Sequence, residues 1–396
     1  MSVPTIVTMP GDGIGRVVME QALRVLDASG FEASYIEGDI GWEFWCKEGN
    51  PLPERTIKLL EEHKVGLFGA ITSKPKDEAM AELSPQLQGK GFVYSSPIVG
   101  MRQHFNLDIC IRPCRTYKGN PLNFIRRGRD GKIEEPGIDV VIFRQNTEGL
   151  YSGVEWGHPE GIVYDALMSH PNFKKNYGKM PKEEISVSTR IFTKKATERI
   201  LRAAFEYARK YNYKSVTVCE KPNVIRETSG MMYKMAKEIQ KEYSEIQLWN
   251  TNIDAQMMWL TKNPEDYGVI VAGNMFGDIV SDGFAGLIGG LGFACSANMG
   301  EGIAVFEPTH GSAPKYAGYK TSIVNPVAMI ESACLMLDFL KEDSTAAKIR
   351  KAIAEVISEG KVRTYDMMKM AGKPDVVEKG AASTQQMADA IIEKLK

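Results

Sequence analysis

The sequence has few cysteines, no CxxC pair and no long apolar run. Its 6 cysteines are scattered over 396 residues, which excludes a disulfide framework and favours reduced thiols in a cytosol-like compartment. The longest informative uncharged run, 283–299, contains five glycines and is shorter than the ~20 apolar residues of a membrane-spanning helix. No basic stretch precedes Arg16, as a secretory signal would require. We therefore expect a cytoplasmic protein that does not bind membranes.

Neither sign of charge is in excess. The chain has 49 Lys and Arg against 50 Asp and Glu, a formal net charge of −1, and no basic block. This balance argues against nucleic acid or an acidic membrane surface as a partner. A small anionic substrate is still allowed, because a neutral protein can concentrate a few arginines in one cleft. With 43% hydrophobic and 25% charged residues, the composition is globular, and the length favours two or three domains.

Short β-branched runs alternate with segments of helical periodicity along most of the chain. The predicted strands are 5–9, 34–36, 65–70, 140–143, 215–218 and 269–272, and the clearest predicted helices are 54–62 and 193–211. This alternation is typical of an α/β protein.

Residues 154–188 break the alternation. The segment is polar and contains Pro and Gly, with Trp156, Tyr164, Phe173 and Tyr177 spread through it. Loops beyond about 15 residues are uncommon unless they have a function. We expect a subunit contact here, and a plain surface loop is the alternative.

A glycine-rich turn, Gly11-Asp12-Gly13-Ile14-Gly15, follows the first predicted strand. A dinucleotide-binding Rossmann turn needs glycine at its sixth position, which is occupied by Arg16. We therefore predict a tight strand-to-helix turn close to some ligand.

Acidic and basic side chains form two further candidate groups. Asp278 and Asp282 are four residues apart and share one helix face, and their hard oxygen donors favour Mg²⁺ or Mn²⁺ over zinc. Arg102, Arg112 and Arg144 lie near turns or strand ends, and guanidinium groups bind carboxylates in a bidentate manner. The alternatives are a solvated acidic face and surface salt bridges.

The segment from Glu307 to Gly318 surrounds His310 with small residues and glycines and contains Lys315. Small residues allow a close backbone approach to a phosphate-bearing ligand. A structured loop without a ligand is the alternative.

Five motifs in this order resemble the isocitrate and isopropylmalate dehydrogenase family, the β-hydroxyacid oxidative decarboxylases. They are the 11–15 turn, Arg112-Pro113, 144–153 (RQNTEGLYSG), 274–282 (NMFGDIVSD) and 310–314 (HGSAP). The resemblance covers Thr5 to Ile392, essentially the whole chain.

The resemblance implies the family's own α/β fold with a large and a small α/β domain, not a Rossmann fold. The large domain would combine 1–108 with 289–396, and the small domain would combine 109–153 with 189–288. Residues 154–188 would be a clasp or arm at the interface of a homodimer. The active-site cleft would lie between the domains and be completed by the partner subunit.

The resemblance also implies residue roles. Lys221 would act as general base or proton relay, Tyr151 would protonate the enol carbon, and Asp254 of the other subunit would join Asp278 and Asp282 around Mg²⁺ or Mn²⁺. The substrate would be bound by Ser96, Arg102, Arg112 and Arg144. The nucleotide cofactor would be bound by Thr72, Asn223, His310, Gly311, Ser312, Ala313, Lys315, Tyr316, Asn325, Tyr365 and Lys369.

The segment before Arg102 bears on the substrate. Ser96 matches isocitrate enzymes of the family, whereas Ile98 stands where those enzymes have asparagine. Ile98-Val99 partly matches isopropylmalate enzymes, and homoisocitrate enzymes tend to have arginine at the position of Val99. Residues 154–156 are similar to the isocitrate branch. We predict isocitrate, with isopropylmalate, homoisocitrate and a malate- or tartrate-like acid as alternatives.

For the cofactor, the resemblance favours NADP over NAD. NAD-preferring relatives typically have aspartate at the position of Lys315. Here Lys315, Tyr316, Tyr365 and Lys369 offer two cations and two hydroxyl groups to a 2′-phosphate. A non-catalytic regulatory subunit is an alternative of another class, but such a subunit would be expected to lack metal or base residues that are present here.

Overall fold

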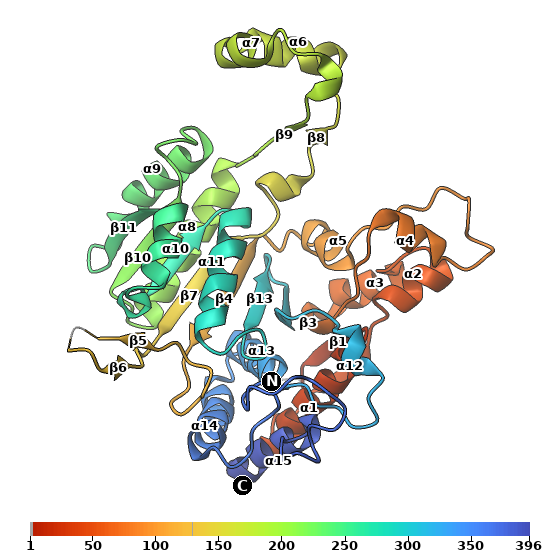
Figure 1. The fold of residues 1–396 in the computed structure, drawn as a ribbon, viewed down its shortest axis with the longest axis vertical. Coiled ribbons are helices and arrows are strands. Elements are labelled where there is room, and N and C mark those ends of the chain that lie inside the picture. Colours follow the sequence, from red (N-terminus) through yellow and green to blue (C-terminus); the bar gives the residue numbers. More distant parts are fainter. Residues whose placement is uncertain (1–2, 129) are drawn as a thin grey trace.

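One mixed sheet of ten strands runs through the centre of the molecule (Figure 1). The computed structural model describes residues 3–128 and 130–396. The strands lie in the order β11-β10-β12-β7-β4-β13-β14-β3-β1-β2. Their bounds are β1 Thr5–Gly11, β2 Ser34–Glu37, β3 Val65–Ala70, β4 Ile109–Arg115, β7 Asp139–Gln145, β10 Ser215–Glu220, β11 Gln247–Asn252, β12 Val269–Ala272, β13 Cys295–Met299 and β14 Ala304–Pro308.

The centre of this sheet is antiparallel. Strands β11, β10, β12 and β7 are parallel to one another, and so are β14, β3, β1 and β2. Between these two groups, β4 pairs antiparallel with β7, β13 pairs antiparallel with β4, and β14 pairs antiparallel with β13. The α/β class predicted from the sequence is confirmed. A Rossmann sheet is mostly parallel with a 3-2-1-4-5-6 order, which this sheet does not have.

Helices cover both halves of the sheet. Helices α1, α13, α14 and α15 pack together beside β3, β13 and β14, whereas α8 to α11 surround the strands of the other half. The helices are α1 Gly15–Ala28, α2 Trp42–Glu48, α3 Glu54–His63, α4 Lys76–Ala81, α5 Pro97–His104, α6 Gly161–Ser169, α7 Pro171–Tyr177, α8 Lys194–Lys210, α9 Thr228–Gln240, α10 Ile253–Leu260, α11 Asn274–Leu287, α12 Pro314–Ala317, α13 Val327–Phe339, α14 Asp343–Glu359 and α15 Thr384–Leu395. Short 3₁₀ turns occupy Leu150–Ser152, Lys182–Glu184 and Pro264–Asp266.

Apolar packing attaches the helices to the two halves of the sheet. Val141, Val218 and Val271 of the sheet pack with Phe205 of α8 in one fully buried cluster. A larger cluster joins α1 to α13, α14 and α15. Burying each large aliphatic or aromatic side chain contributes roughly 1.5–3 kcal/mol. The strand ends that carry the candidate site are therefore attached to a rigid base. Because the sheet is continuous through β4 and β13, the division into large and small domains stays a prediction.

Residues 154–188 form an arm that projects away from the rest of the molecule (Figure 1). The hairpin of β8 (Glu155–Trp156) and β9 (Val187–Ser188) leads to α6 and α7. The two helices pack on each other through aromatic rings of Tyr164, Phe173 and Tyr177. The alternative of a plain surface loop is wrong, because the segment contains two helices. These helices, α6 and α7, have 9 and 7 residues, which is too few turns to give a clear periodic signal in the sequence.

In the part of the chain that the structure describes, no helix is long and apolar enough to span a bilayer.

Candidate active site

The glycine-rich turn after β1 brings three segments into close backbone contact. A Cβ atom on Gly11 would lie 2.0 Å from the carbonyl oxygen of Ala70, and one on Gly13 would lie 2.2 Å from that of Ser312. The carboxylate of Asp12 accepts hydrogen bonds from the backbone of Thr72 and Trp42, both at 2.8 Å. The glycines therefore serve to position the Ser312 loop against β1 and β3.

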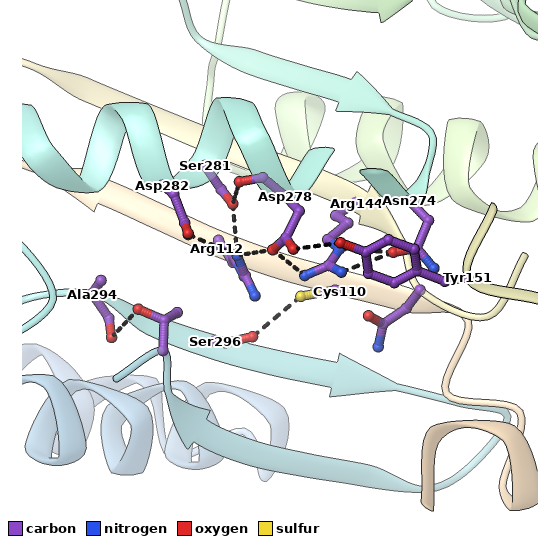
Figure 2. Close-up of polar contacts among 12 residues, drawn as sticks. Cys110, Arg112, Arg144, Tyr151, Asn274, Asp278, Ser281, Asp282, Ala294 and Ser296 are labelled. Carbon is purple, nitrogen blue, oxygen red and sulfur yellow. Dashed lines mark hydrogen bonds and ion pairs between the residues drawn. The ribbon is translucent and has the colours of Figure 1, made fainter. Parts of the chain in front are cut away.

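Helix α11 lies directly on strand β7. A Cβ atom on Gly277 would lie 2.8 Å from the Cβ of Arg144, so only glycine permits this approach. The helix starts immediately after β12 and presents Asp278 and Asp282 on successive turns of one face. The close approach places both carboxylates above arginines of the neighbouring strands (Figure 2).

Arg112 on β4 and Arg144 on β7 converge on Asp278. Arg112 Nη1 lies 3.0 Å from Asp278 Oδ1 and 3.3 Å from Asp282 Oδ1, and it donates to Ser281 Oγ at 2.7 Å. Arg144 forms an ion pair with the same Oδ1 of Asp278. Asn274 Oδ1 accepts from Nε and Nη2 of Arg144 at 3.0 and 2.8 Å. Figure 2 shows this group between the helix and the two strands.

Tyr151 completes the group from the 3₁₀ turn after β7. Its hydroxyl donates to Asp278 Oδ2 at 3.0 Å, and its ring centroid lies 5.3 Å from the guanidinium carbon of Arg144. Burial and the negative charge of Asp278 raise the pKa of Tyr151. Because its pKa is raised, the phenol keeps its proton at neutral pH. The residue is 41% exposed and can be reached from solvent.

The two carboxyl groups of α11 have different acidities. Burial alone would raise the pKa of Asp278, but Arg144, Arg112 and the Tyr151 hydroxyl together hold it below its ordinary value. Burial raises the pKa of Asp282, and the charge of Asp278 adds to this effect despite the attraction of Arg112. Different environments on one helix face thus move the pKa values of the two carboxyl groups in opposite directions.

A hard divalent cation fits the carboxylates of α11. Oxygen atoms of Asp278 and Asp282 both approach one atom, Arg112 Nη1, which shows that they face the same small volume. Asp282 is 60% exposed and therefore open to further ligands. In residues 3–128 and 130–396, no group of three or more His, Cys, Asp and Glu side chains could hold a metal ion. A cation bound by these two aspartates would need additional oxygen ligands, such as water, a substrate carboxylate or a carboxylate of a partner subunit.

Lys221 and Asp254 lie apart from this group and pair with each other. Lys221 follows β10, and Asp254 lies in the first turn of α10; their side chains form an ion pair. The hydrogen bond from Lys221 lowers the pKa of Asp254. Asn223, which the sequence also selects, is exposed two residues further on. The single chain therefore brings Lys221 to Asp254 but neither of them to Asp278.

Arg102 is engaged by side chains that the sequence did not indicate. Arg102 Nη2 donates to Glu307 Oε1 at 2.8 Å, and Nε donates to Asn298 Oδ1 at 3.1 Å. Ser96 is partly buried at the start of α5, and Ile98 packs against the apolar cluster around β1 and β3. Long-range contacts of this kind have no local sequence signal. Asn274 and Ser281, in contrast, lie inside the predicted 274–282 motif.

The His310 loop has an unpartnered acceptor. His310 Nδ1 donates to the carbonyl of Gly311 at 3.0 Å, which leaves Nε2 as the acceptor nitrogen. Nε2 is buried and has no hydrogen-bond partner among the described residues. Burial lowers the pKa of His310, so the ring is neutral. Ser312 Oγ lies 2.7 Å from Thr72 Oγ1, and Ala313 has a left-handed backbone with φ of 39°.

The other predicted cofactor residues gather around α12. The rings of Tyr316 and Tyr365 are 5.7 Å apart, and Lys315 Nζ lies 4.6 Å from the centroid of the Tyr316 ring. Asn325 Nδ2 donates to Asp366 Oδ2 at 3.2 Å. Lys315 and Lys369 are exposed, and within the described part of the chain neither pairs with a carboxylate. An unpaired histidine nitrogen, two tyrosines and two free ammonium groups fit a phosphorylated nucleotide.

Comparisons with known proteins agree with this geometry. A family model described as isocitrate/isopropylmalate dehydrogenase matches residues 5–391. Protein DlpA of Legionella pneumophila is 37% identical over 390 residues, which are 98% of this chain and 58% of that protein. This chain thus spans little more than half of DlpA. The 3-isopropylmalate dehydrogenase of Methanothermobacter thermautotrophicus is 36% identical over 384 residues, with 97% and 98% covered.

Among solved structures, the crystal structure of isocitrate dehydrogenase from Methylococcus capsulatus superimposes with a TM-score of 0.80. It is 32% identical to this chain, and the match covers 99% of both chains. The fold predicted from the sequence motifs is therefore confirmed.

Proposed function

The chain belongs to the isocitrate/isopropylmalate dehydrogenase family, and from this we propose that it catalyses the metal-dependent oxidative decarboxylation of isocitrate to 2-oxoglutarate and CO₂, with reduction of NADP. The observation that carries the proposal is the convergence of Arg112, Arg144, Tyr151 and two aspartates at one place. Two guanidinium groups suit a substrate with more than one carboxylate.

Each residue of the group has a role in this reaction. Arg112 and Arg144 bind substrate carboxylates and orient the C2 hydroxyl group. Tyr151, whose pKa is raised, carries the proton that reaches the enol carbon after CO₂ has left. Lys221 accepts the hydroxyl proton or relays it.

Asp278 and Asp282, with Asp254 of the partner subunit, would hold Mg²⁺ or Mn²⁺. When bound, the cation would polarise the hydroxyl oxygen and stabilise negative charge on it. In this proposal the enzyme is a homodimer, because Lys221 and Asp254 pair with each other and not with Asp278 in a single chain and would reach such a site in a second chain. The cytoplasm is its proposed location, as the few unpaired cysteines suggest.

Isocitrate is favoured by Ser96 and by the 154–156 segment, which is similar to the isocitrate branch. Ile98 and Val99 partly match the apolar pair of isopropylmalate enzymes, although Ile98 packs against the apolar cluster around β1 and β3. Isopropylmalate is therefore the second candidate. Homoisocitrate and malate- or tartrate-like acids are weaker candidates. The arrangement around Lys315 and Tyr316 supports NADP, since the Lys315 ammonium and the phenols of Tyr316 and Tyr365 lie together. Lys369 follows Tyr365 in the same turn and would add a second ammonium group for a 2′-phosphate.

The experiment that tests the function is a steady-state assay of the purified chain. Isocitrate, 3-isopropylmalate, homoisocitrate, malate and tartrate would each be supplied with NADP⁺ or NAD⁺ and Mn²⁺. We expect the highest kcat/KM with isocitrate and NADP⁺. No activity with any of these acids would reject an enzyme and support a non-catalytic subunit.

A further inference from the structure

Glu220 is a buried carboxylate directly before Lys221 at the end of β10. Its side chain is 0% exposed. Arg190 Nη2 donates to both of its oxygens, at 2.8 and 3.0 Å. Ser229 Oγ donates to Oε2 at 2.6 Å, and the backbone N–H of Gly273 donates to Oε1 at 2.7 Å. A buried charge is tolerated when it is paired and hydrogen-bonded in this way.

The network of Glu220 reaches the start of helix α11. Gly273 is the residue before α11, and a Cβ atom there would lie 2.6 Å from Glu220 Oε1. Glycine at this position thus allows the helix N-terminus, which carries partial positive charge, to meet the carboxylate. The next residue, Asn274, accepts two hydrogen bonds from Arg144. Glu220 therefore contacts the residue that precedes α11, the helix that carries Asp278.

The same network reaches the backbone of Lys221. The N–H of Lys221 donates to Ser229 Oγ at 3.4 Å, and Arg190 Nη1 donates to that hydroxyl at 2.8 Å. Arg190 is two residues from the end of the arm strand β9. One carboxylate thus connects the root of the arm, the turn that carries Lys221 and the first turn of α11.

We propose that Glu220 is a positioning residue for the reaction, acting through Lys221 and through the aspartates of α11. This inference rests on the proposed function. Lys221 is proposed to serve the cleft of the partner subunit, whereas α11 serves the cleft of its own chain. Glu220 consequently fixes components of two different active sites with one buried charge.

The test is the Glu220→Gln variant in the full-length chain. Arg190 Nη2 donates to both carboxylate oxygens, so in either orientation the amide NH₂ of glutamine faces a guanidinium N–H and displaces it. Arg112 and Arg144 lie on β4 and β7 and do not contact Glu220. We therefore expect kcat to fall by about tenfold or more, while KM for the 2-hydroxy acid stays within about threefold. Amide hydrogen exchange should become faster in 221–229 and 273–277.

Glu331→Gln is the matched control. Glu331 is also buried and paired with an arginine, Arg350, and it accepts a hydrogen bond from Tyr117. It lies on α13, which carries no residue of the candidate site. The control should lower the melting temperature but leave kcat within about twofold, because the loss of a buried pair affects stability. Should Glu220→Gln not fold, Ser229→Ala removes one member of the network and is expected to show the same kcat effect.

Each outcome decides between the two proposals. A wild-type chain that is inactive with every acid would overturn the proposed function and the role of Glu220 with it. An active wild type whose Glu220→Gln and Ser229→Ala variants keep wild-type kcat would overturn the positioning role alone. So would faster exchange confined to one of the two segments. A tenfold lower kcat with unchanged KM, absent from Glu331→Gln, supports it.

Discussion

Arg102 and Glu307 form a buried ion pair, with Arg102 Nη2 2.8 Å from Glu307 Oε1 and both side chains at most 11% exposed. Asn298 bonds both partners, at 3.1 Å to Arg102 and 2.7 Å to Glu307. Arg102 therefore differs from Arg112 and Arg144, whose partners are the carboxylates of α11. A substrate carboxylate that binds Arg102 must share this guanidinium with Glu307.

The first prediction follows from this pair. Arg102→Met leaves Glu307 buried without its cation, which costs about 3–5 kcal/mol when one partner of a buried pair is removed. We expect the free energy of unfolding, measured with urea, to fall by about this amount. Lys241→Met, in the exposed pair with Glu238, is the control and should cost less than about 1 kcal/mol. Equal losses in both variants would contradict the prediction.

The second prediction concerns the metal. Asp282→Asn removes a charged oxygen donor at an exposed position and one ion pair with Arg112, so stability should change by no more than about 1 kcal/mol. The Mn²⁺ concentration for half-maximal activity should rise at least about tenfold. Chelator-treated wild-type enzyme should be inactive and recover with Mn²⁺. Full activity after exhaustive chelation would refute metal dependence.

The third prediction tests a shared active site. Lys221 pairs with Asp254 and not with Asp282 in a single chain. Lys221→Met should therefore be inactive alone, and Asp282→Asn should have little activity alone at the Mn²⁺ concentration that just saturates the wild type. Mixed subunits should regain some activity, because one of the two hybrid sites then has neither change while the other has both. Mass spectrometry of the mixture would establish that subunits have exchanged. Exchange without recovery of activity would argue against sites built from two chains.

The fourth prediction concerns the nucleotide. Each charge-assisted hydrogen bond to a 2′-phosphate contributes about 1.5–3 kcal/mol, which is at least about tenfold in affinity. Lys315→Asp with Tyr316→Ile replaces an attractive charge by a repulsive one. The ratio of kcat/KM for NADP⁺ over NAD⁺ should fall by at least about an order of magnitude. A wild-type ratio at or below one would reject the NADP assignment.

The fifth prediction is a pH dependence of stability. Burial raises the pKa of Asp108 to about 6, and Arg199 offsets this only in part. Between the ordinary pKa of 3.8 and the raised value of about 6, Asp108 is therefore more protonated in the folded chain than in the unfolded chain. Stability from the neutral carboxyl is thus lost as pH rises towards 6. The melting temperature of Asp108→Asn should therefore rise relative to that of the wild type as the pH increases from 4.5 to 6.5. Parallel curves would contradict this.

Local patterns in the sequence predict the regular elements well. The run 65–70 is β3, and the predicted 193–211 helix is α8, with Thr193 as its N-cap. Buried strands and amphipathic helices are specified by neighbouring residues. The helices of the arm escape prediction because they are short and stabilised by each other. The antiparallel centre of the sheet cannot be predicted from local patterns either, because β13 pairs with β4 across more than 150 residues.

For the candidate site, the sequence identifies the charged residues but not all their partners. Asp278 and Asp282 share a helix face, as their spacing predicts, and Arg112 and Arg144 lie beside them. The bonds of Arg102 to Asn298 and Glu307, and those of Glu220 to Arg190 and Gly273, join residues far apart in the chain. Such pairings arise from tertiary packing, which no local motif encodes.

The strand order has a consequence for synthesis of the chain. Strand β3 needs β14 on one side, and roughly 240 residues separate them, which takes on the order of 10–50 s to translate. Strands β4, β7, β10, β11 and β12 all lie within 109–272 and can assemble earlier. During this interval the nascent N-terminal strands present an open, apolar edge that could pair with another chain. The strand order thus makes the β3 edge the part of the fold that is completed late in synthesis.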